Sequence, residues 1–383
     1  MFRAAAVASM EKFSFEGGER LGAALVEKLG SSPRACWLFA APGDDLQGLL
    51  DGVLSTAGTD ILAGCTTDGE ICGDELLAGA AVLGGVASDS VRFSVASMAG
   101  LDEDSEKAGR RLAAKLPRDT AYVQLFSDGL RGNGCALLRG MASVLGPEVP
   151  VSGGTAGDGG RFLETCQFAG REVLTGYAVA MGLSGDFRVG TGVASGWSPV
   201  GIAKKVTRAR GNVVYGLNHQ PALEVYERFL GRHADRLPSV GVEYPLGLVD
   251  PSGHGECLLL RATMSVNRSE GSIAFSGEVP EGSMVRLTCG DHASVLKAAR
   301  RAARQALDRL EGRPPVMAFV YSCMARKIVL GRRTREEILA IGEELGASIP
   351  MLGFYTYGEY SPLECGSANR LHNETATVAV LGI

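Results

Sequence analysis

The sequence predicts an α/β fold of the mixed α+β kind, in which internally repeated strand–helix–strand–strand units form two sheet-based halves. A short apolar run that stops at glycine and leads into a polar tip occurs three times, at residues 61–70, 149–158 and 350–359. Each tip follows a strand-like run and a helix-period segment, and precedes another strand. Such units normally make parallel strands. We therefore expect all three tips at carboxyl ends of strands, where ligands bind.

The first unit shows its elements through apolar periodicity and turn residues. Helical spacing of Leu21, Leu25 and Leu29 predicts a helix that begins near Gly18. Alternation and glycines predict that the two strands after the first tip form a hairpin. The predicted elements are a helix over 18–29, a strand over 35–40, a helix over 46–54, a hairpin of 79–84 with 91–97, and a helix over 105–116.

The second unit contains a glycine-rich loop, 127–134, between a strand over 121–127 and a helix. The loop matches neither GxxxxGK[ST] nor GxGxxG, so a plain strand-to-helix turn is favoured over a phosphate cradle. Farther on, strands over 162–168 and 173–182 are predicted to form a hairpin.

The break at Trp197 to Gly201 is the expected hinge, which divides the chain into domains 1–201 and 202–383. Pro221 opens a predicted amphipathic helix, and the longest helix is expected from about His292 to Leu310. Thr334 is the expected cap of the helix in the third unit.

Composition places the chain among ordinary globular proteins, with 45% hydrophobic and 21% charged residues. The net charge of −5 argues against nucleic acid as a partner. The sequence shows neither an apolar run long enough to span a membrane nor a secretory signal, so we expect a cytoplasmic protein. The nine cysteines include no close zinc-type pair and are expected as reduced thiols.

Polar side chains concentrate at the strand ends of the third unit, which makes a ligand pocket the favoured interpretation over simple capping. For an amino-acid-like ligand, Arg326 would pair with a carboxylate and Glu359 with an amine. The candidate ligand-binding residues are Cys323, Arg326, Tyr355, Thr356, Tyr357, Glu359, His372 and Asn373.

Two other chemistries remain open for the same unit. Arg326 would lower the pKa of the nearby Cys323 thiol. Cys323 and His372 would then act together in a thiol-dependent hydrolase or transferase, although no cysteine-hydrolase signature surrounds them. No two of the five histidines are spaced as zinc ligands. A lone histidine can still bind haem iron, with His372 the first choice and His219 the alternative, while the loop residue His254 is not excluded.

Several motifs together resemble those of FIST-domain proteins over nearly the whole chain. They lie at 64–70, 153–158, 196–201, 323–326, 353–359 and 372–375. The resemblance implies a sensory module of prokaryotic signal transduction, with an N-terminal FIST part to about Gly201 and a C-terminal part beyond. It also implies small ligands such as amino acids. Some stand-alone members are haem-binding nitric-oxide sensors that control a partner histidine kinase. The partners implied are thus a small molecule and a histidine kinase or other signalling protein, and an oligomer remains open.

Overall fold

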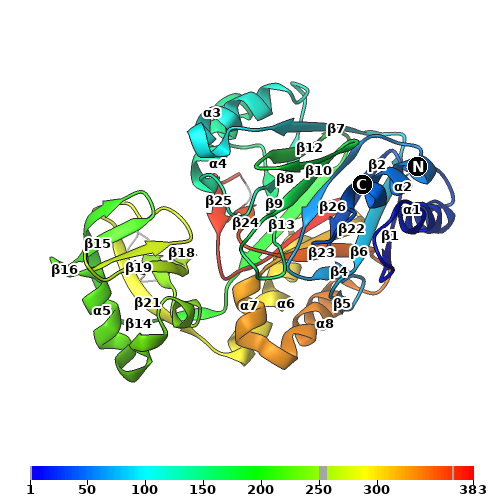
Figure 1. Ribbon diagram of the computed structural model, residues 1–383. Helices are drawn as coiled ribbons and strands as arrows, with labels where there is room; N and C mark the ends of the chain where they lie inside the picture. Colours follow the sequence, from blue (N-terminus) through cyan, green and yellow to red (C-terminus); the bar gives the residue numbers. More distant parts are fainter. Residues whose placement is uncertain (1, 250–256, 365) are drawn as a thin grey trace.

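The computed structural model describes residues 2–249, 257–364 and 366–383. They form a large body with three six-stranded sheets and a smaller lobe with a fourth sheet (Figure 1). Helices and strands are both abundant, and parallel and antiparallel pairs occur within each body sheet. The predicted mixed α+β class is therefore confirmed.

The body consists of three repeats of the same element order. The first comprises β1 (Phe2–Ser9), α1 (Phe15–Leu29), β2 (Ala35–Ala40), α2 (Leu46–Ala57), β3 (Leu62–Thr66), β4 (Glu70–Cys72), β5 (Glu75–Leu77) and β6 (Ala81–Ser88). The second comprises β7 (Val91–Met98), α3 (Leu101–Ala114), β8 (Tyr122–Ser127), α4 (Gly134–Leu145), β9 (Val151–Thr155), β10 (Cys166–Ala169), β11 (Glu172–Thr175) and β12 (Ala178–Gly185). The third comprises β13 (Arg188–Ala194), α6 (His292–Asp308), β22 (Pro315–Cys323), α7 (Met324–Leu330), α8 (Thr334–Leu345), β23 (Met351–Thr356), β24 (Glu359–Pro362), β25 (Asn369–His372) and β26 (Ala376–Gly382).

The lobe is inserted between β13 and α6, at the point where the other two repeats have short loops. It comprises β14 (Trp197–Arg210), β15 (Val213–Leu217), β16 (Gln220–Pro221), α5 (Ala222–Leu230), two 3-10 turns (Gly231–Arg236 and Ser239–Val242), β17 (Leu246–Val249), β18 (Cys257–Arg261), β19 (Thr263–Asn267), β20 (Ser272–Phe275) and β21 (Met284–Gly290). The predicted domain boundary after residue 201 lies inside β14, near the entry to the lobe. Residues 291–383 then rejoin the body.

Each body sheet has a pair of parallel strands at its centre, namely β2 with β3, β8 with β9 and β22 with β23. An antiparallel strand of the same repeat lies on one side, and a hairpin from another repeat lies on the other. Hairpin β4–β5 pairs with β23, β10–β11 pairs with β3, and β24–β25 pairs with β9. This cyclic exchange of hairpins ties the repeats together and brings their tips to one junction.

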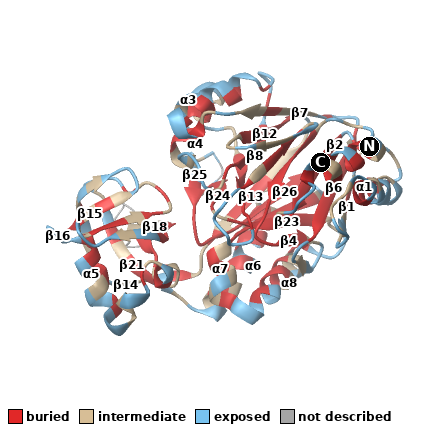
Figure 2. Ribbon diagram, viewed as in Figure 1, coloured by how far each residue is buried: buried red, intermediate tan, exposed pale blue. Residues whose placement is uncertain are grey.

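The inner faces of the three sheets share one aromatic core. Trp37 contacts Phe319 with ring centroids 4.9 Å apart, and Phe39 contacts Phe354 at 4.7 Å. Helix pairs cover the outer faces: α1 with α2, α3 with α4, and α6 with α8. Their buried sides face the sheets and their exposed sides face solvent (Figure 2). Apolar burial on both faces explains why these strands read as continuous apolar runs.

The glycine before each tip is required by close packing of parallel strands. A Cβ at Gly64 would lie 1.8 Å from the carbonyl oxygen of Leu38, and one at Gly353 would lie 1.8 Å from that of Val320. Gly153 makes the equivalent approach to Leu125 at 2.1 Å. The recurring glycine in the sequence therefore marks the same position in each repeat.

Three sequence expectations need correction. The strands predicted as the hairpin 79–84 with 91–97 belong to two different sheets, because β6 pairs with β1 and β2 whereas β7 pairs with β12. The strand predicted from Phe162 begins only at Cys166, and after β11 the chain enters the next sheet as β12. Thr334 does not cap α8, because its hydroxyl donates to the carbonyl of Gly331.

Among the described residues, no helix is long and apolar enough to cross a membrane.

Candidate functional site

The three polar tips meet at one end of the body, where backbone hydrogen bonds join each to the other two. The amide of Gly157 donates to Thr66, that of Asp68 to Tyr355, and that of Thr155 to Gly358, at 2.9, 2.9 and 2.8 Å. The tips follow the parallel strands β3, β9 and β23, as the sequence predicts. Because ligands bind beyond the carboxyl ends of such strands, this junction is the candidate site.

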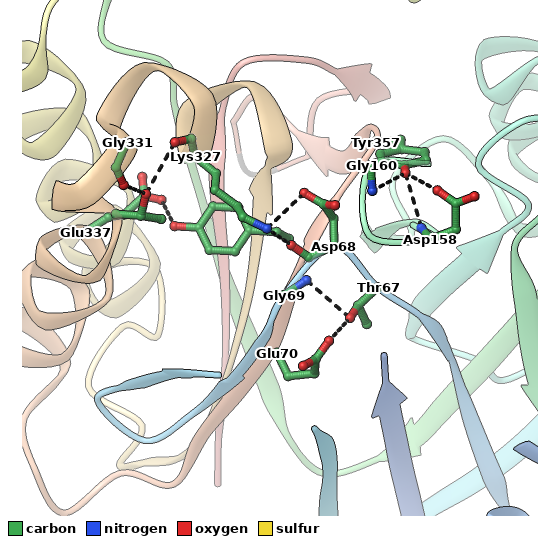
Figure 3. A network of polar contacts seen from close by, with 12 residues as sticks. Thr67, Asp68, Gly69, Glu70, Asp158, Gly160, Lys327, Gly331, Glu337 and Tyr357 are labelled. Carbon is green, nitrogen blue, oxygen red and sulfur yellow. Dashed lines mark hydrogen bonds and ion pairs between the residues drawn. The ribbon is translucent and has the colours of Figure 1, made fainter. Parts of the chain in front are cut away.

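Lys327 and Asp68 join the third repeat to the first tip (Figure 3). The ammonium of Lys327, on α7, donates to the main-chain oxygen of Asp68 and to its Oδ2, the latter at 3.3 Å. Asp68 is buried, and burial raises the pKa of its carboxyl, while Lys327 opposes the rise and Asp158 adds to it. The half-exposed Lys327 thus compensates a carboxylate that would otherwise resist ionisation.

Asp158 organises the second tip. Its carboxylate accepts the amides of Phe162, Leu163 and Glu164 at 2.9, 2.7 and 3.1 Å, and the hydroxyl of Tyr357. Although burial raises the pKa of Asp158, the hydroxyl of Tyr357 and these amides hold it below its usual value. The ring of Tyr357 stacks on Phe162 at 4.6 Å. Asp158 therefore fixes the loop that prevents a strand from starting at Phe162, and it ties the second tip to the third.

A pocket of about 110 Å³ opens beside the junction. Its walls come from the loop after β8, from the second and third tips, and from the lobe. The residues that carry polar groups into its lining include Asp128, Arg131, Thr155, Tyr357, Asn373 and the lobe residue Ser276. The pocket therefore spans two repeats of the body and the inserted lobe.

The glycine-rich loop does not form a phosphate cradle. The carboxylate of Asp128 accepts the amides of Leu130 and Arg131 at 2.8 and 2.9 Å. Asp102 accepts the amide of Gly132 at 3.1 Å. Because protein carboxylates already take these amides and place negative charge beside them, a phosphate has no open nest here.

Two polar groups of the pocket remain available to a ligand. The exposed side chain of Arg131 has neither a hydrogen-bond nor an ion-pair partner within residues 2–249, 257–364 and 366–383. The buried hydroxyl of Thr155 has no hydrogen-bond partner in the same ranges. A guanidinium binds a carboxylate well, and a buried hydroxyl accepts from an amine, so the pocket suits a small polar molecule that carries both groups.

The structure places two of the eight predicted residues, Tyr357 and Asn373, at this pocket. The Asn373 side chain is held by Arg261, which donates to its Oδ1 at 3.4 Å. The other six are buried below the surface: Cys323, Arg326, Tyr355, Thr356, Glu359 and His372.

Arg326 is not available to a ligand carboxylate, contrary to the sequence expectation. Its side chain is fully buried and pairs with Glu337 at 2.6 Å. It also donates to the carbonyl oxygens of Val295, at 2.8 Å, of Ser195 and of Glu374. The hydroxyl of Tyr355 donates to the same Glu337 at 2.5 Å. These residues thus form a satisfied internal network rather than the wall of a pocket.

The expected thiolate is not favoured by its surroundings. Burial raises the pKa of the Cys323 thiol, and the nearby carboxyls of Glu359 and Glu374 raise it further. His372 instead bonds through Nε2 to the carbonyl of Ser361 at 2.9 Å, and burial lowers its pKa to about 4. Among the described residues no hydrogen bond joins Cys323 to His372, so the pairing that activates a nucleophile is not seen there.

Glu359 and Thr356 also make hydrogen bonds inside the protein rather than at the pocket. Glu359 accepts the amide and hydroxyl of Thr375 through Oε2, at 3.2 and 2.7 Å, which leaves no exposed carboxylate for a ligand amine. The hydroxyl of Thr356 donates to the carbonyl of Thr155 at 2.6 Å. Both residues thus brace the third tip from behind the pocket.

Neither His372 nor His219, the histidines proposed for haem, lines the pocket. His372 is buried with Nε2 engaged, and His219 lies exposed on the turn between β15 and β16, with a φ of 64°. His254 lies outside the described residues. Nor do the described residues include a cluster of three or more His, Cys, Asp or Glu side chains arranged for a metal ion.

Three further candidate residues were not predicted from the sequence: Arg131, Thr155 and Lys327. The loop around Arg131 carried a signal, because a glycine-rich segment follows a strand there. No sequence signal distinguished Lys327 from a surface lysine, since its partner Asp68 lies far away in the chain.

Family models match almost the whole chain, with a FIST N domain over residues 34–220 and a FIST C domain over residues 222–362. The chain belongs to the FIST family. FIST domains bind small ligands and are associated with sensing in signal transduction. The family boundary at residues 220–222 lies within the lobe, between β15 and α5.

Similar proteins are known from bacteria and archaea. This FIST chain is 32% identical over 244 residues to the uncharacterised Mycobacterium tuberculosis protein Rv0628c, a match that covers 61% of each chain. It is 26% identical over 210 residues to the uncharacterised Methanocaldococcus jannaschii protein MJ1623, covering 50% of this chain and 39% of that one. The chain thus spans about three fifths or less of these relatives.

Solved structures show only distant likeness. A cyanuric acid hydrolase from A. caulinodans aligns with a TM-score of 0.37 and 10% identity, covering 100% of this chain and 99% of that one. Thermotoga maritima PurL in complex with ATP aligns with a TM-score of 0.23 and 10% identity, covering 100% and 71%. Likeness at this level supports no inference about activity.

Proposed function

We propose that this FIST protein is a sensor of a small amino-acid-like metabolite, which binds in the pocket between loop 128–134, the third tip and the lobe. The observation that carries the proposal is that the body and the lobe both line this pocket. A ligand acts by binding two conformations unequally. A molecule held between two parts of the chain has the means to do so, because its contacts depend on how those parts are placed.

Polar contacts between body and lobe surround the pocket. The lobe residue Arg261 donates to the carbonyl of Leu371 at 3.1 Å and to Asn373. The lobe residue Glu278 accepts from Asn133 and Arg139 of the body, each at 2.8 Å. Asn373 and Asn133 also line the pocket. A ligand that touches them therefore acts on the groups that position the lobe.

The dimensions and charges of the pocket define the ligand class. A volume of about 110 Å³ lies well below the roughly 300 to 1,000 Å³ of sites for drug-sized molecules. Arg131 offers a partner for a carboxylate, and Thr155 offers an acceptor for an amine. The roles first expected of Arg326 and Glu359 thus pass to Arg131 and Thr155. Following the family resemblance, the receiver of the signal is a histidine kinase or another signalling protein.

Calorimetric titration with a panel of amino acids and small carboxylic acids tests the proposal. We expect one ligand to bind with a 1:1 stoichiometry, and Arg131→Ala to weaken it about tenfold or more, because a charge-assisted bond is lost. Arg118→Ala is the matched control, since Arg118 is exposed and lies outside the pocket lining. Unchanged affinity in Arg131→Ala would remove this pocket from the mechanism.

The haem alternative has its own readout. A visible spectrum of protein expressed with added haem, before and after nitric oxide, is expected to show no stoichiometric Soret band. A band that shifts with the gas would replace the metabolite proposal with the haem-sensing one.

A further inference from the structure

An exposed apolar groove lies on the lobe, away from the pocket. It has a volume of about 240 Å³, and we name it the lobe groove. Its lining consists of Val200, Gly201, Ile202, Lys204, Gln220, Val225, Arg228, Phe229 and Leu287. Ile202 is 77% exposed and Phe229 is 40% exposed. Two large apolar side chains at one groove indicate an interaction surface more than scattered surface residues do.

A β-bulge presents Ile202 to solvent. Between β14 and β21, Val200 pairs with Leu287 and Lys204 pairs with Val285, so β14 carries two more residues than its partner over this interval. Gly201 has a φ of 68°, and Arg286 donates to its carbonyl at 2.7 Å. The bulge is thus anchored by a specific contact. Bulges often re-aim a side chain, and here the chain re-aims an isoleucine outward.

The charge of the lobe groove is positive. Lys204 and Arg228 contribute cations, and none of the described residues in its lining is a carboxylate. Arg228 donates to Gln220 at 3.3 Å, which leaves its charge uncompensated within the groove. The groove therefore fits an apolar side chain that has acidic neighbours.

A surface with the opposite character lies at the start of α1, and we name it the N-terminal face. It surrounds a hollow of about 230 Å³ lined by residues that include Met10, Glu11, Lys12, Phe13, Asp44 and Asp45. Met10 is 61% exposed, and the adjoining Phe15 is 42% exposed. Glu16, which follows Phe15, is also exposed. Glu11 is paired with Arg20, but the exposed carboxylates of Glu16, Asp44 and Asp45 outnumber the remaining cation, Lys12, so the face presents apolar side chains among negative charges.

We propose that the lobe groove of one copy binds the N-terminal face of a second copy. The two surfaces have exposed apolar side chains and opposite charge. The lobe and α1 lie on opposite sides of the molecule, so the groove of one copy meets the N-terminal face of another copy (Figure 1). The contact is therefore heterologous, and it builds a head-to-tail chain or ring. The inference is independent of the proposed ligand and pocket.

Sedimentation velocity on the full-length protein, from micromolar to high micromolar concentration, tests this association. We expect the weight-average sedimentation coefficient to rise with concentration and to fall with added salt, because the surfaces carry opposite charge. Ile202→Glu and Phe15→Glu should each hold the protein as a monomer. Met264→Glu is the matched control, since Met264 is an exposed lobe residue outside the groove, and it should associate as the unmodified protein does.

Mixing the two monomeric variants is the decisive measurement. The Phe15→Glu protein keeps an intact lobe groove, and the Ile202→Glu protein keeps an intact N-terminal face. An equimolar mixture should therefore form a 1:1 complex that grows no further. A monomeric unmodified protein at every concentration, association that survives either substitution, or a mixture that stays monomeric would overturn the proposal. Unchanged thermal midpoints of both variants would show that they fold.

Discussion

Two buried carboxyls, those of Glu359 and Glu374, lie behind the pocket. Glu359 follows the pocket residue Gly358, and Glu374 follows the pocket residue Asn373, yet both carboxyls are fully buried. Glu359 Oε1 and both oxygens of Glu374 have no hydrogen-bond partner in the described parts of the chain. Burial raises the pKa of Glu359 from 4.5 to about 8. It also raises that of Glu374, and the neighbouring Glu359 adds to that rise.

The direction of the pH effect follows from linkage. Below about pH 4.5 both the folded and the unfolded protein hold the proton of Glu359, so this group does not affect stability. Between 4.5 and about 8 the unfolded chain loses the proton while the folded chain keeps it, so stability falls as the pH rises. At about 1.4 kcal/mol per pH unit, Glu359 costs on the order of 5 kcal/mol by pH 8.

Glu359→Gln removes this titration while it keeps the shape of the protonated acid. Urea unfolding at pH values from 5 to 9 should give nearly equal stabilities at pH 5 and a growing advantage for the variant up to about pH 8. The exposed Glu148→Gln serves as the control and should follow the unmodified protein throughout. Parallel stability curves for Glu359→Gln and the unmodified protein would refute the claim that Glu359 is protonated in the folded state.

Three further predictions test the interior. Arg326→Met should destabilise the fold by about 3 to 5 kcal/mol in urea unfolding, because it leaves Glu337 buried without its cation; a change below about 1 kcal/mol would contradict the network. In iodoacetamide labelling followed by mass spectrometry, the exposed Cys289 should react while Cys323 stays unmodified, and fast labelling of Cys323 would revive the thiol-enzyme hypothesis. Gly353→Ala should prevent folding, because its Cβ would lie 1.8 Å from a carbonyl oxygen. Gly342→Ala in α8 is the control and should raise the stability of the fold by up to about 1 kcal/mol. Equal thermal midpoints of the two variants would contradict this packing.

The repeat could be predicted from the sequence because its causes are local. A glycine at 64, 153 and 353 is required by the neighbouring strand, and the apolar runs around it are required by burial on two faces. Pairing between distant segments leaves no such local signal. Nothing in residues 70–77 indicates that the hairpin of β4 and β5 joins β23 through β4, so the hairpin exchange could not be predicted. The predicted hairpin of β6 with β7 was wrong for the same reason. The two strands are adjacent in the sequence, which favours a hairpin, but β6 pairs with β2 and β7 pairs with β12.

The candidate site shows a similar limit. The sequence located the tips correctly at strand ends, and it selected Tyr357 and Asn373, which line the pocket. Its main error was to treat polar side chains at strand ends as exposed. Arg326 illustrates the reason, because its partner Glu337 lies one helix turn into α8 and no local pattern reveals the pairing. Which side of a strand end faces solvent depends on the lobe and the exchanged hairpins.

The repeats also suggest why the pocket occurs where it does. Each repeat has a loop between its first central strand and the following helix, and a tip from another repeat lies against that loop. In the first repeat, Phe13 packs on Gly43 of this loop, where a Cβ would lie 2.5 Å from the ring. In the third, Lys327 binds Asp68 just after the buried Arg326. In the second, the side chain of Arg131 has no partner among the described residues, and the pocket opens beside it. The second repeat thus leaves a space at its loop, and Ser276 of the lobe, which is inserted in the third repeat, lines one side of it.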